Sequence, residues 1–306
     1  MTSRVQGERA IPLCLPGNYQ WDPETMKCTK TGEERSYMYV VEEALKKLRR
    51  IKGPVCVVSI TGPYRKGKSY ILSEAFHQPD VFPLGHTMLA ETVGIWMWIL
   101  PEKLKDCNGQ EVSVVLLDTE GTESAQGTGF DDHQIFTLTV LVSSVLIYNS
   151  SAVANRRDLE ELEFIVNLSQ RIQVRSRSEC DVGPEDSDIF HETFPYFVWL
   201  LRDVTLSLPS DCSNVKDYFL TKVFQEVATS EKSKEATHSI LKFFSGFDAF
   251  ALPLPTDKME VLHNISNSKD TLSAHFLKDL RQFQLFMKDV IVAKKSVKTE
   301  EPVTGE

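Results

Sequence analysis

The chain has 306 residues, of which 42% are hydrophobic and 25% are charged, a composition typical of a globular protein with a substantial core. Its formal net charge of -9 argues against nucleic acid as a partner, because binding to a phosphate backbone requires a basic face. The 6 cysteines include no Cys-x-x-Cys pair, so we expect neither a zinc site nor a dense disulfide framework, and a reducing cytoplasmic location fits best.

Apolar, β-branched runs bounded by polar or Gly/Pro residues recur along the chain and are typical of strands. In chain order, the predicted strands are 55–61, 95–100, 112–118, 144–149, 197–201 and 249–254. Helical patterns lie at 36–50, 68–76, 133–142, 158–172, 215–228 and 270–291. This alternation predicts an α/β fold of three layers, in which helices flank a mostly parallel central sheet.

A single domain over residues 1–306 is the simpler organisation, with an N-terminal extension over about 1–34. The charged tail over about 294–306 is expected to fray. Residues 175–188 are polar and contain Gly and Pro, which predicts a surface insertion. The longest apolar stretch, 135–148, contains Thr and Ser and is too short to cross a bilayer, so no membrane span is predicted.

Residues 62–69 complete a Gly-x-x-x-x-Gly-Lys-Ser pattern directly after the first predicted strand. Gly62 and Gly67 allow the backbone to turn so that successive N–H groups face phosphate oxygens. Lys68 supplies a cation, and Ser69 offers a hydroxyl to Mg²⁺ at the start of a helix. The pattern therefore predicts a P-loop that binds a nucleoside triphosphate together with Mg²⁺.

Two further segments follow in the order that a P-loop site requires. Asp118-Thr-Glu-Gly121 ends a buried strand, so Asp118 can reach Mg²⁺ through water and the Gly121 N–H can contact the γ-phosphate. A simple turn is the alternative interpretation of that pattern. Thr92 precedes the strand at 95–100 and could add a hydroxyl to the magnesium shell, although a β-branched residue at a strand entrance needs no such role. The predicted metal ligands are Ser69, Thr92 and Asp118.

Guanine is usually selected by an aspartate that accepts hydrogen bonds from the base N1–H and the exocyclic amine. Asn214-Val-Lys-Asp217 has its lysine one place too late for the common Asn-Lys-x-Asp signature and lacks a preceding apolar strand. We therefore treat it as a decoy. Arg202-Asp203, directly after the strand at 197–201, has the better context, with a surface ion pair as the alternative.

Together these segments resemble the guanylate-binding proteins, large GTPases of the dynamin superfamily. The resemblance rests on GPYRKGKS, TVGIWMW, LLDTEGT, SSVLIYNS and VWLLRD, spread over most of residues 55–255. Atlastins have a similar P-loop, but the GIWMW and DTEG forms look more like guanylate-binding proteins. The resemblance implies that Asp203 selects guanine with Arg202 beside it. It also implies a base-covering cap in residues 242–255, whose phenylalanines could equally belong to the core.

The resemblance implies catalytic roles as well. Thr122 stands where small GTPases place a water-positioning Gln, so another group must align the water. Arg65 would act as an arginine finger within the same chain, and Glu120 would take part in a network that holds the water and the switch. The family commonly has a serine and a histidine where this chain has Ala90 and Glu91, which predicts retained GTP binding with slowed hydrolysis.

The expected activity is cleavage of GTP to GDP, with GMP as a second product in some family members, in a nucleotide-dependent homodimer formed through the nucleotide faces. The alternatives are a GTP-dependent scaffold with very slow turnover and an ATP-handling P-loop enzyme. The family's helical stalk is absent from these 306 residues. The predicted catalytic residues are Arg65, Lys68, Thr92 and Glu120. The predicted nucleotide-binding residues are Gly62, Tyr64, Arg65, Lys66, Gly67, Lys68, Ser69, Tyr70, Asp118, Gly121, Arg202 and Asp203.

Overall fold

The fold was obtained as a computed structural model, which describes residues 9–32, 37–84, 92–121, 129–162, 194–296, 299 and 301–305. The strands of its central sheet are β1 (Ile11–Pro16), β4 (Met38–Val40), β5 (Val55–Thr61), β6 (Ile95–Ile99), β7 (Leu104–Lys105), β8 (Glu111–Thr119), β9 (Val145–Ser151), β10 (Tyr196–Arg202) and β11 (Gly246–Leu252). A separate hairpin joins β2 (Tyr19–Asp22) to β3 (Lys27–Lys30).

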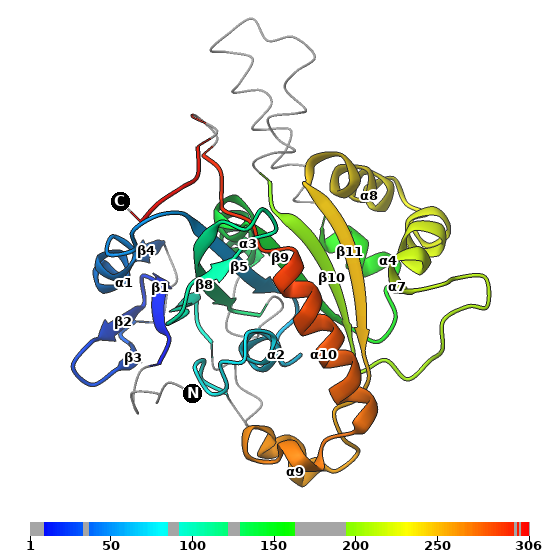
Figure 1. Ribbon diagram of the computed structural model, residues 1–306, viewed down its shortest axis with the longest axis horizontal. Coiled ribbons are helices and arrows are strands. Elements are labelled where there is room, and N and C mark those ends of the chain that lie inside the picture. The colour runs from blue at the N-terminus through cyan, green and yellow to red at the C-terminus, as the bar shows by residue number, and fades with distance from the viewer. Residues whose placement is uncertain are drawn as a thin grey trace, which may run out of the picture.

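The central sheet is 9-stranded and follows the order β11-β10-β9-β5-β8-β6-β1-β4, with β7 paired to β8. The strands from β11 to β8 in that order are parallel to one another. Antiparallel pairing begins where β6 joins β8, and it continues through β1 and β4. The α/β prediction is therefore confirmed, and the antiparallel strands are confined to one side of the sheet (Figure 1).

Helices flank the sheet. They are α1 (Glu42–Leu48), α2 (Lys68–Ala75), α3 (Gly129–Val142), α4 (Arg156–Glu161), α7 (Val215–Tyr218), the π-helix η1 (Phe219–Val227), α8 (Glu231–Phe243), α9 (Met259–His263), the 3₁₀ turns η2 (Ile265–Asn267) and η3 (Lys269–Thr271), and α10 (Ala274–Asp289). In Figure 1, α2 and α10 lie side by side in front of the sheet, and they are in contact.

Two hydrophobic clusters pack against the sheet, and along β10 they cover its opposite faces. Val198 and Leu200 pack in the cluster that contains α2 and α10, whereas Phe197 and Trp199 pack in the cluster that contains α8 and η1. Successive side chains of a strand point to opposite faces, so one apolar strand can serve both layers. This arrangement accounts for the uninterrupted apolar character of the predicted strands.

The antiparallel strands correct the prediction for the N-terminal region. Ile11 and Leu15 are buried in β1, which pairs with both β6 and β4, so this strand of the expected extension belongs to the central sheet, whereas β2 and β3 form the separate hairpin. The helix predicted from residue 36 begins only at Glu42, because residues 38–40 form the edge strand β4. Prolines and short polar stretches obscure the strand pattern in this part of the sequence.

The expected fraying of the C-terminal tail is wrong for its described residues. The backbone N–H of Lys294 donates to the carbonyl oxygen of Val55 at 2.8 Å, and the N–H of Val55 donates to the carbonyl oxygen of Val303 at 3.0 Å. The tail therefore lies along the start of β5, where backbone hydrogen bonds replace the solvation that its charged composition favours.

Three predicted helices also need correction. The segment 215–228 is one turn of α-helix followed by η1, and 270–291 becomes η3 and α10. The helix predicted at 158–172 begins as α4, and its continuation and the insertion predicted at 175–188 lie outside the described residues. Helix α8 was not predicted, although Ser230 caps it by accepting a hydrogen bond from the N–H of Ser233.

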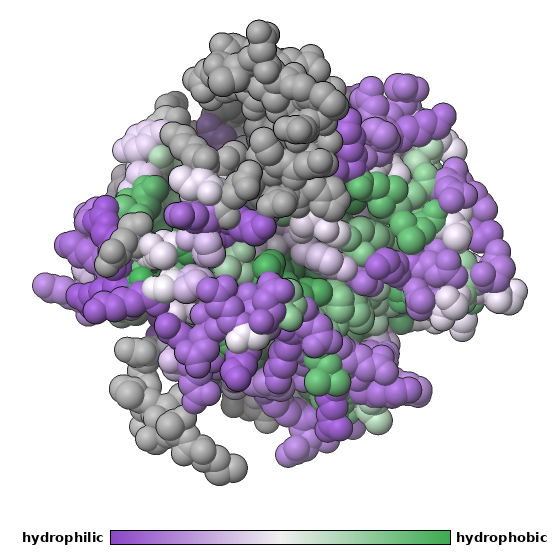
Figure 2. All heavy atoms as spheres, turned by 45° about the horizontal axis from the view of Figure 1, so that its top comes forward, coloured by the Kyte–Doolittle hydropathy of each residue, from purple (hydrophilic) through white to green (hydrophobic). Residues whose placement is uncertain are grey.

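On the face drawn in Figure 2, hydrophobic side chains lie in patches between hydrophilic ones. None of the helices within the described residues has the length and apolar character that a bilayer-crossing helix needs.

Candidate functional site

The candidate site lies where the parallel strands end. The carboxyl ends of β5, β8, β10 and β11 meet at one edge of the sheet, which is where ligands bind in open α/β sheets. A cavity of about 320 Å³ opens there. It is lined by Tyr64, Arg65, Lys66, Gly67, Lys68, Ser69, Tyr70, Pro83, Leu84, Thr92, Thr119, Gly121, Arg202, Asp203, Leu254, Pro255, Leu262 and Ile265.

The loop between β5 and α2 has the backbone that its glycines predict. Gly67 is the N-cap of α2 and has a φ of 69°, and Gly62 has a φ of 130°. A Cβ at Gly62 would collide with the carbonyl oxygen of Asn149 at the end of β9. The collision at Gly62 and the positive φ at Gly67 therefore favour glycine at both positions, and the first turn of α2 lines the cavity, where the N–H groups at a helix start attract anions.

One buried carboxylate organises the end of the cavity that the P-loop lines. Asp118 Oδ2 accepts hydrogen bonds from Ser69 Oγ at 2.7 Å and from Thr92 Oγ1 at 3.1 Å. Burial raises the pKa of Asp118, and the nearby Lys68 cation and the two hydroxyls oppose that rise. The three predicted metal ligands thus come from three separate segments and meet at one carboxylate.

The donor set fits Mg²⁺. Asp118 is fully buried, and its other oxygen, Oδ1, has no hydrogen-bond partner among the residues that the structure describes. A buried carboxylate oxygen that lacks a donor is costly unless a cation or a cation-bound water satisfies it. Carboxylate and hydroxyl oxygens are the hard donors that Mg²⁺ prefers.

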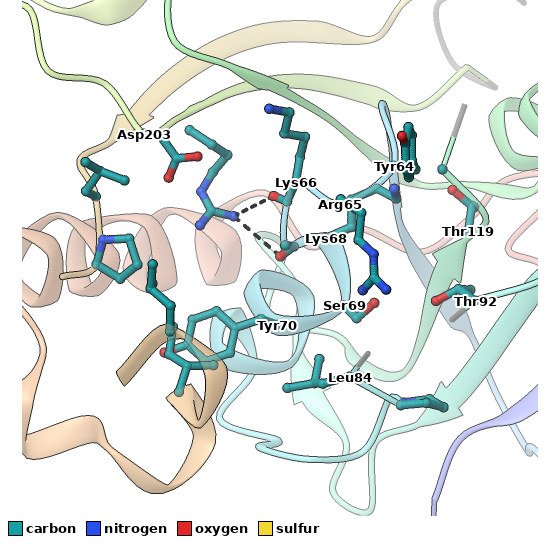
Figure 3. A pocket seen from close by; sticks show the side chains of 18 residues that line it. Tyr64, Arg65, Lys66, Lys68, Ser69, Tyr70, Leu84, Thr92, Thr119 and Asp203 are labelled. Carbon is teal, nitrogen blue, oxygen red and sulfur yellow. Dashed lines mark hydrogen bonds between the residues drawn. The ribbon is translucent and has the colours of Figure 1, made fainter. Parts of the chain in front are cut away.

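Other predicted residues surround this cluster. Lys68 is buried, and its ammonium donates to the carbonyl oxygen of Pro63 at 3.0 Å. Arg65 is exposed, with a φ of 61°, and in Figure 3 its side chain extends into the cavity on the side of Ser69. A Cβ at Gly121 would collide with the backbone of Tyr64, so these two loops lie in tight contact.

Glu120 does not line the cavity. Its carboxylate accepts a hydrogen bond from the Gly94 N–H at 3.0 Å, and its own N–H donates to the Gly94 carbonyl oxygen at 2.7 Å. Glu120 therefore fixes the backbone two residues after Thr92. Among the described residues, its contact supports the segment that the sequence analysis treated as a switch.

Asp203 lies at the opposite end of the cavity from Ser69 and Thr92 (Figure 3). It follows β10 with a φ of 59°, a conformation that aspartate tolerates better than most residues, and its carboxylate is partly exposed. The neighbouring Arg202 is buried and donates to the carbonyl oxygens of Lys66 at 3.2 Å and Gly67 at 3.4 Å, as the dashed lines in Figure 3 mark. Burial lowers the pKa of Arg202, and Asp203 opposes that shift.

The wall beside Asp203 differs from the predicted cap. Phe243, Phe244 and Phe247 pack in the hydrophobic core, and Phe250 packs against α10. Leu254 and Pro255 from the predicted region do line the cavity. The phenylalanines are buried by the helix-covered sheet before the chain reaches the cavity, so the alternative of core packing is correct for them.

Several lining residues were missed by the sequence analysis. Four of them are apolar residues of types that occur in any core or turn, so nothing in the sequence marks them as ligand-binding. They are Pro83, Leu84, Leu262 and Ile265. Asn149 was also missed, although its Nδ2 donates to the carbonyl oxygen of Lys66 at 3.1 Å and so supports the P-loop from β9. Its position at the end of an apolar strand was the signal that could have identified it.

Two predictions and one decoy remain to be placed. Ala90, Glu91 and Thr122 lie outside the described residues. Asn214 and Asp217 lie at the start of α7, where the Asn214 side chain accepts a hydrogen bond from the Asp217 N–H at 2.8 Å. They cap a helix and are not among the described residues that line the cavity.

Comparison with known proteins agrees with this geometry. Residues 35–300 match the family model for the guanylate-binding protein, N-terminal domain. The chain belongs to the guanylate-binding protein family. It is 34% identical to human guanylate-binding protein 2 over 271 residues, which cover 87% of this chain and 44% of that protein. It is 37% identical to human guanylate-binding protein 3 over 248 residues (79% and 41%) and 35% identical to mouse guanylate-binding protein 6 over 279 residues (89% and 42%).

This member of the guanylate-binding protein family spans less than half the length of these curated relatives, about 44% of human guanylate-binding protein 2. The matched region includes the P-loop, Asp118 and Asp203, and all the described residues that line the cavity fall within it. Strand β1, which pairs with β6, lies before the match.

Proposed function

We propose that this guanylate-binding protein domain binds GTP in the cavity, with the triphosphate at the P-loop and the guanine at Asp203. The observation that carries the proposal is the separation of two chemistries within one cavity. Hydroxyls and a buried carboxylate converge at one end, and a single carboxylate acceptor lies at the other. A magnesium-bound triphosphate and a base with two donors are the complementary groups.

Each phosphate-end residue has a distinct task in this proposal. The N–H groups at the start of α2 and the Lys68 ammonium bind the β- and γ-phosphate oxygens. Ser69 and Thr92 would hold Mg²⁺ through their hydroxyls, and Asp118 would hold it through water. The bound ion would neutralise negative charge on the phosphates.

Hydrolysis requires groups that act in the transition state. Arg65 is exposed beside the phosphate end and can move over the triphosphate as a finger within the same chain. Glu120 acts indirectly, because its bond to Gly94 holds the segment that carries Thr92. We propose cleavage of GTP to GDP, and chromatographic separation of the products during turnover distinguishes GDP from GMP.

The test of base selection compares two aspartates in equilibrium titrations with GTP and ATP analogues. Asp203→Asn replaces an acceptor by an amide and should weaken guanine preference by about 2–4 kcal/mol. Asp217→Asn, in the Asn-x-Lys-Asp segment that caps α7, is the matched control and should leave the preference unchanged. An unchanged preference in Asp203→Asn would favour an ATP-handling enzyme instead.

Turnover and assembly are tested together. We propose that the domain forms a nucleotide-dependent homodimer through the face that contains the cavity and acts in the cytoplasm. Phosphate release per molecule should then rise with protein concentration. Tight GTP binding with flat, near-zero release would instead favour a GTP-dependent scaffold, the alternative that the absence of a hydroxyl at Ala90 suggests.

The Ala90→Ser variant tests the missing hydroxyl directly. If its single-turnover rate of GTP hydrolysis equals that of the unsubstituted protein, the hydroxyl has no role.

A further inference from the structure

One excursion of the chain forms the wall at the base end of the cavity. It leaves the sheet after β11, passes through α9, η2 and η3, and returns to α10. The Ser273 N–H donates to the carbonyl oxygen of Pro255 at 2.7 Å, so the two ends of the excursion are joined. We call the segment from Pro255 to Ser273 the wall segment. Pro255, Leu262 and Ile265 are its residues in the cavity lining.

The wall segment is attached to the P-loop helix by an ion pair. Lys269 Nζ, in η3, lies 2.7 Å from Oε1 and 2.9 Å from Oε2 of Glu74, in α2. The Glu74 side chain is only 9% exposed, whereas that of Lys269 is 42% exposed. The contact joins residues 195 positions apart in the sequence.

The position of Glu74 makes this ion pair more than a local contact of α2. Glu74 lies in the last turn of the helix, where the carbonyl groups and the helix dipole disfavour a negative charge. Its burial adds a desolvation cost that a partner cation must offset. The helix therefore gains nothing from an acid at this position unless Lys269, and with it the wall segment, is in place.

Helix α2 consequently connects the two ends of the cavity. Its first residues, Lys68 and Ser69, belong to the phosphate end, and Tyr70 lines the cavity beside them. Glu74 lies one turn after Tyr70 on the same side of the helix, because residues four apart share a face. A single rigid element thus carries both the phosphate-binding groups and the anchor of the base-end wall.

We propose that the Glu74–Lys269 ion pair is a positioning contact that sets how long a guanine nucleotide remains bound, because it holds the wall segment against the base. This inference rests on the function proposed above, since it assigns the base to that end of the cavity. Neither residue lines the cavity, whereas Leu262 and Ile265 of the wall segment do. In this proposal the ion pair acts through those two side chains.

The experiment measures dissociation of a fluorescent N-methylanthraniloyl derivative of a nonhydrolysable GTP analogue by stopped flow, with Mg²⁺ present. Lys269→Met keeps the length of the side chain and removes its charge, and it should accelerate dissociation about five- to tenfold. Lys269→Arg keeps the charge and should stay within about twofold of the original rate. In turnover, Lys269→Met should raise KM and leave kcat unchanged, because the phosphate end is untouched.

Gln284→Leu is the matched control. Gln284 Nε2, in α10, donates to the backbone carbonyl oxygen of Glu74 at 2.7 Å, so it contacts the same residue of α2 without involving the wall segment. Its loss should lower the melting temperature and leave nucleotide dissociation within about twofold of the original rate.

Three results would overturn the inference. Lys269→Met could release the nucleotide at the original rate, Gln284→Leu could accelerate release equally, or Lys269→Arg could behave like Lys269→Met. Failure of the unsubstituted, folded protein to bind the guanine analogue at all is a different result, because it would overturn the proposed function itself.

Discussion

The two ends of the cavity are built in different ways. The phosphate end depends on backbone conformation, since Gly62 and Gly67 have positive φ and Gly121 touches Tyr64 too closely for a side chain. The base end depends on side chains from segments far apart in the sequence, including Asp203, Leu254 and Ile265. A site made from backbone leaves a recognisable residue pattern, whereas a wall made from apolar side chains does not.

Arg202 connects the two ends of the cavity. Its guanidinium extends from the end of β10 and donates to two carbonyl oxygens of the P-loop, and it lies against Gly67. The residue next to Asp203, the aspartate proposed to bind guanine, thus supports the P-loop. This comparison predicts that a substitution at the phosphate end should change the affinity for the triphosphate, whereas one at the base end should change the preference for guanine. Only a residue that contacts both ends, such as Arg202, should change both.

The largest effect is expected from Lys68→Met at the phosphate end. Removing the buried ammonium should weaken GTP and ATP analogues alike by about 2–4 kcal/mol, because both carry the same phosphates. Titration calorimetry with both analogues measures this. Lys46→Met, at an exposed position of α1, is the control and should have no effect. A selective loss of GTP alone would contradict the division between the two ends.

Arg202→Lys tests the connection between the two ends. One ammonium cannot reproduce the planar fork that spans the carbonyl oxygens of Lys66 and Gly67, so the free energy of unfolding should fall by about 1–3 kcal/mol. Affinity should fall for both nucleotides, with guanine preference reduced as well, since Asp203 loses its neighbour. Urea unfolding and paired titrations report both quantities. A change restricted to base preference would show that Arg202 does not support the P-loop.

Leu254→Ala tests the base end alone. Leu254 is 42% exposed, so truncation should barely change stability. It removes apolar contact at the base end of the cavity and should weaken a GTP analogue by about 1 kcal/mol, with the affinity for inorganic triphosphate and Mg²⁺ unchanged. Leu285→Ala, at a 62% exposed position of α10, is the control. Equal losses for both ligands would argue against placing the base beside Leu254.

The smallest effect on the cavity is expected from Lys294→Met, far from both ends. Lys294 Nζ donates to the Ser143 carbonyl oxygen at 2.7 Å, and burial lowers the pKa of Lys294 from 10.5 to about 8. Between these pH values the unfolded chain holds a proton that the folded protein lacks, so this residue makes the free energy of unfolding rise with pH. Below pH 8 the lysine is charged in both states and adds no pH dependence.

The measurement is urea unfolding of both proteins at pH 7 and pH 10. The unsubstituted protein should gain about 1–3 kcal/mol relative to Lys294→Met across that interval. The contribution of buried thiols such as Cys14 cancels in the difference between the two proteins. Nucleotide affinity at pH 7 should be equal in both, and a parallel pH profile of stability would contradict the low pKa.

The phosphate end and the parallel half of the sheet were predictable because each follows from a local pattern. The strand predicted at 55–61 has those bounds in β5, and Ser69, Thr92 and Asp118 meet as expected. The antiparallel half was missed, since β1 and β4 acquire their strand conformation from distant partners. The wall segment was missed for a similar reason: Leu262 and Ile265 have the residue types of any buried turn.

The N-terminal strand has a practical consequence. The family match begins at residue 35, but β1 supplies the partner of β6, and a side chain at Gly94 would collide with the carbonyl oxygen of Cys14. An expression fragment trimmed to the matched boundary would expose the apolar edge of β6 as a template for intermolecular pairing. It would also remove the support behind Gly94 and Glu120. We therefore expect inclusion bodies from such a fragment, and a usable minimal domain should start before Ile11.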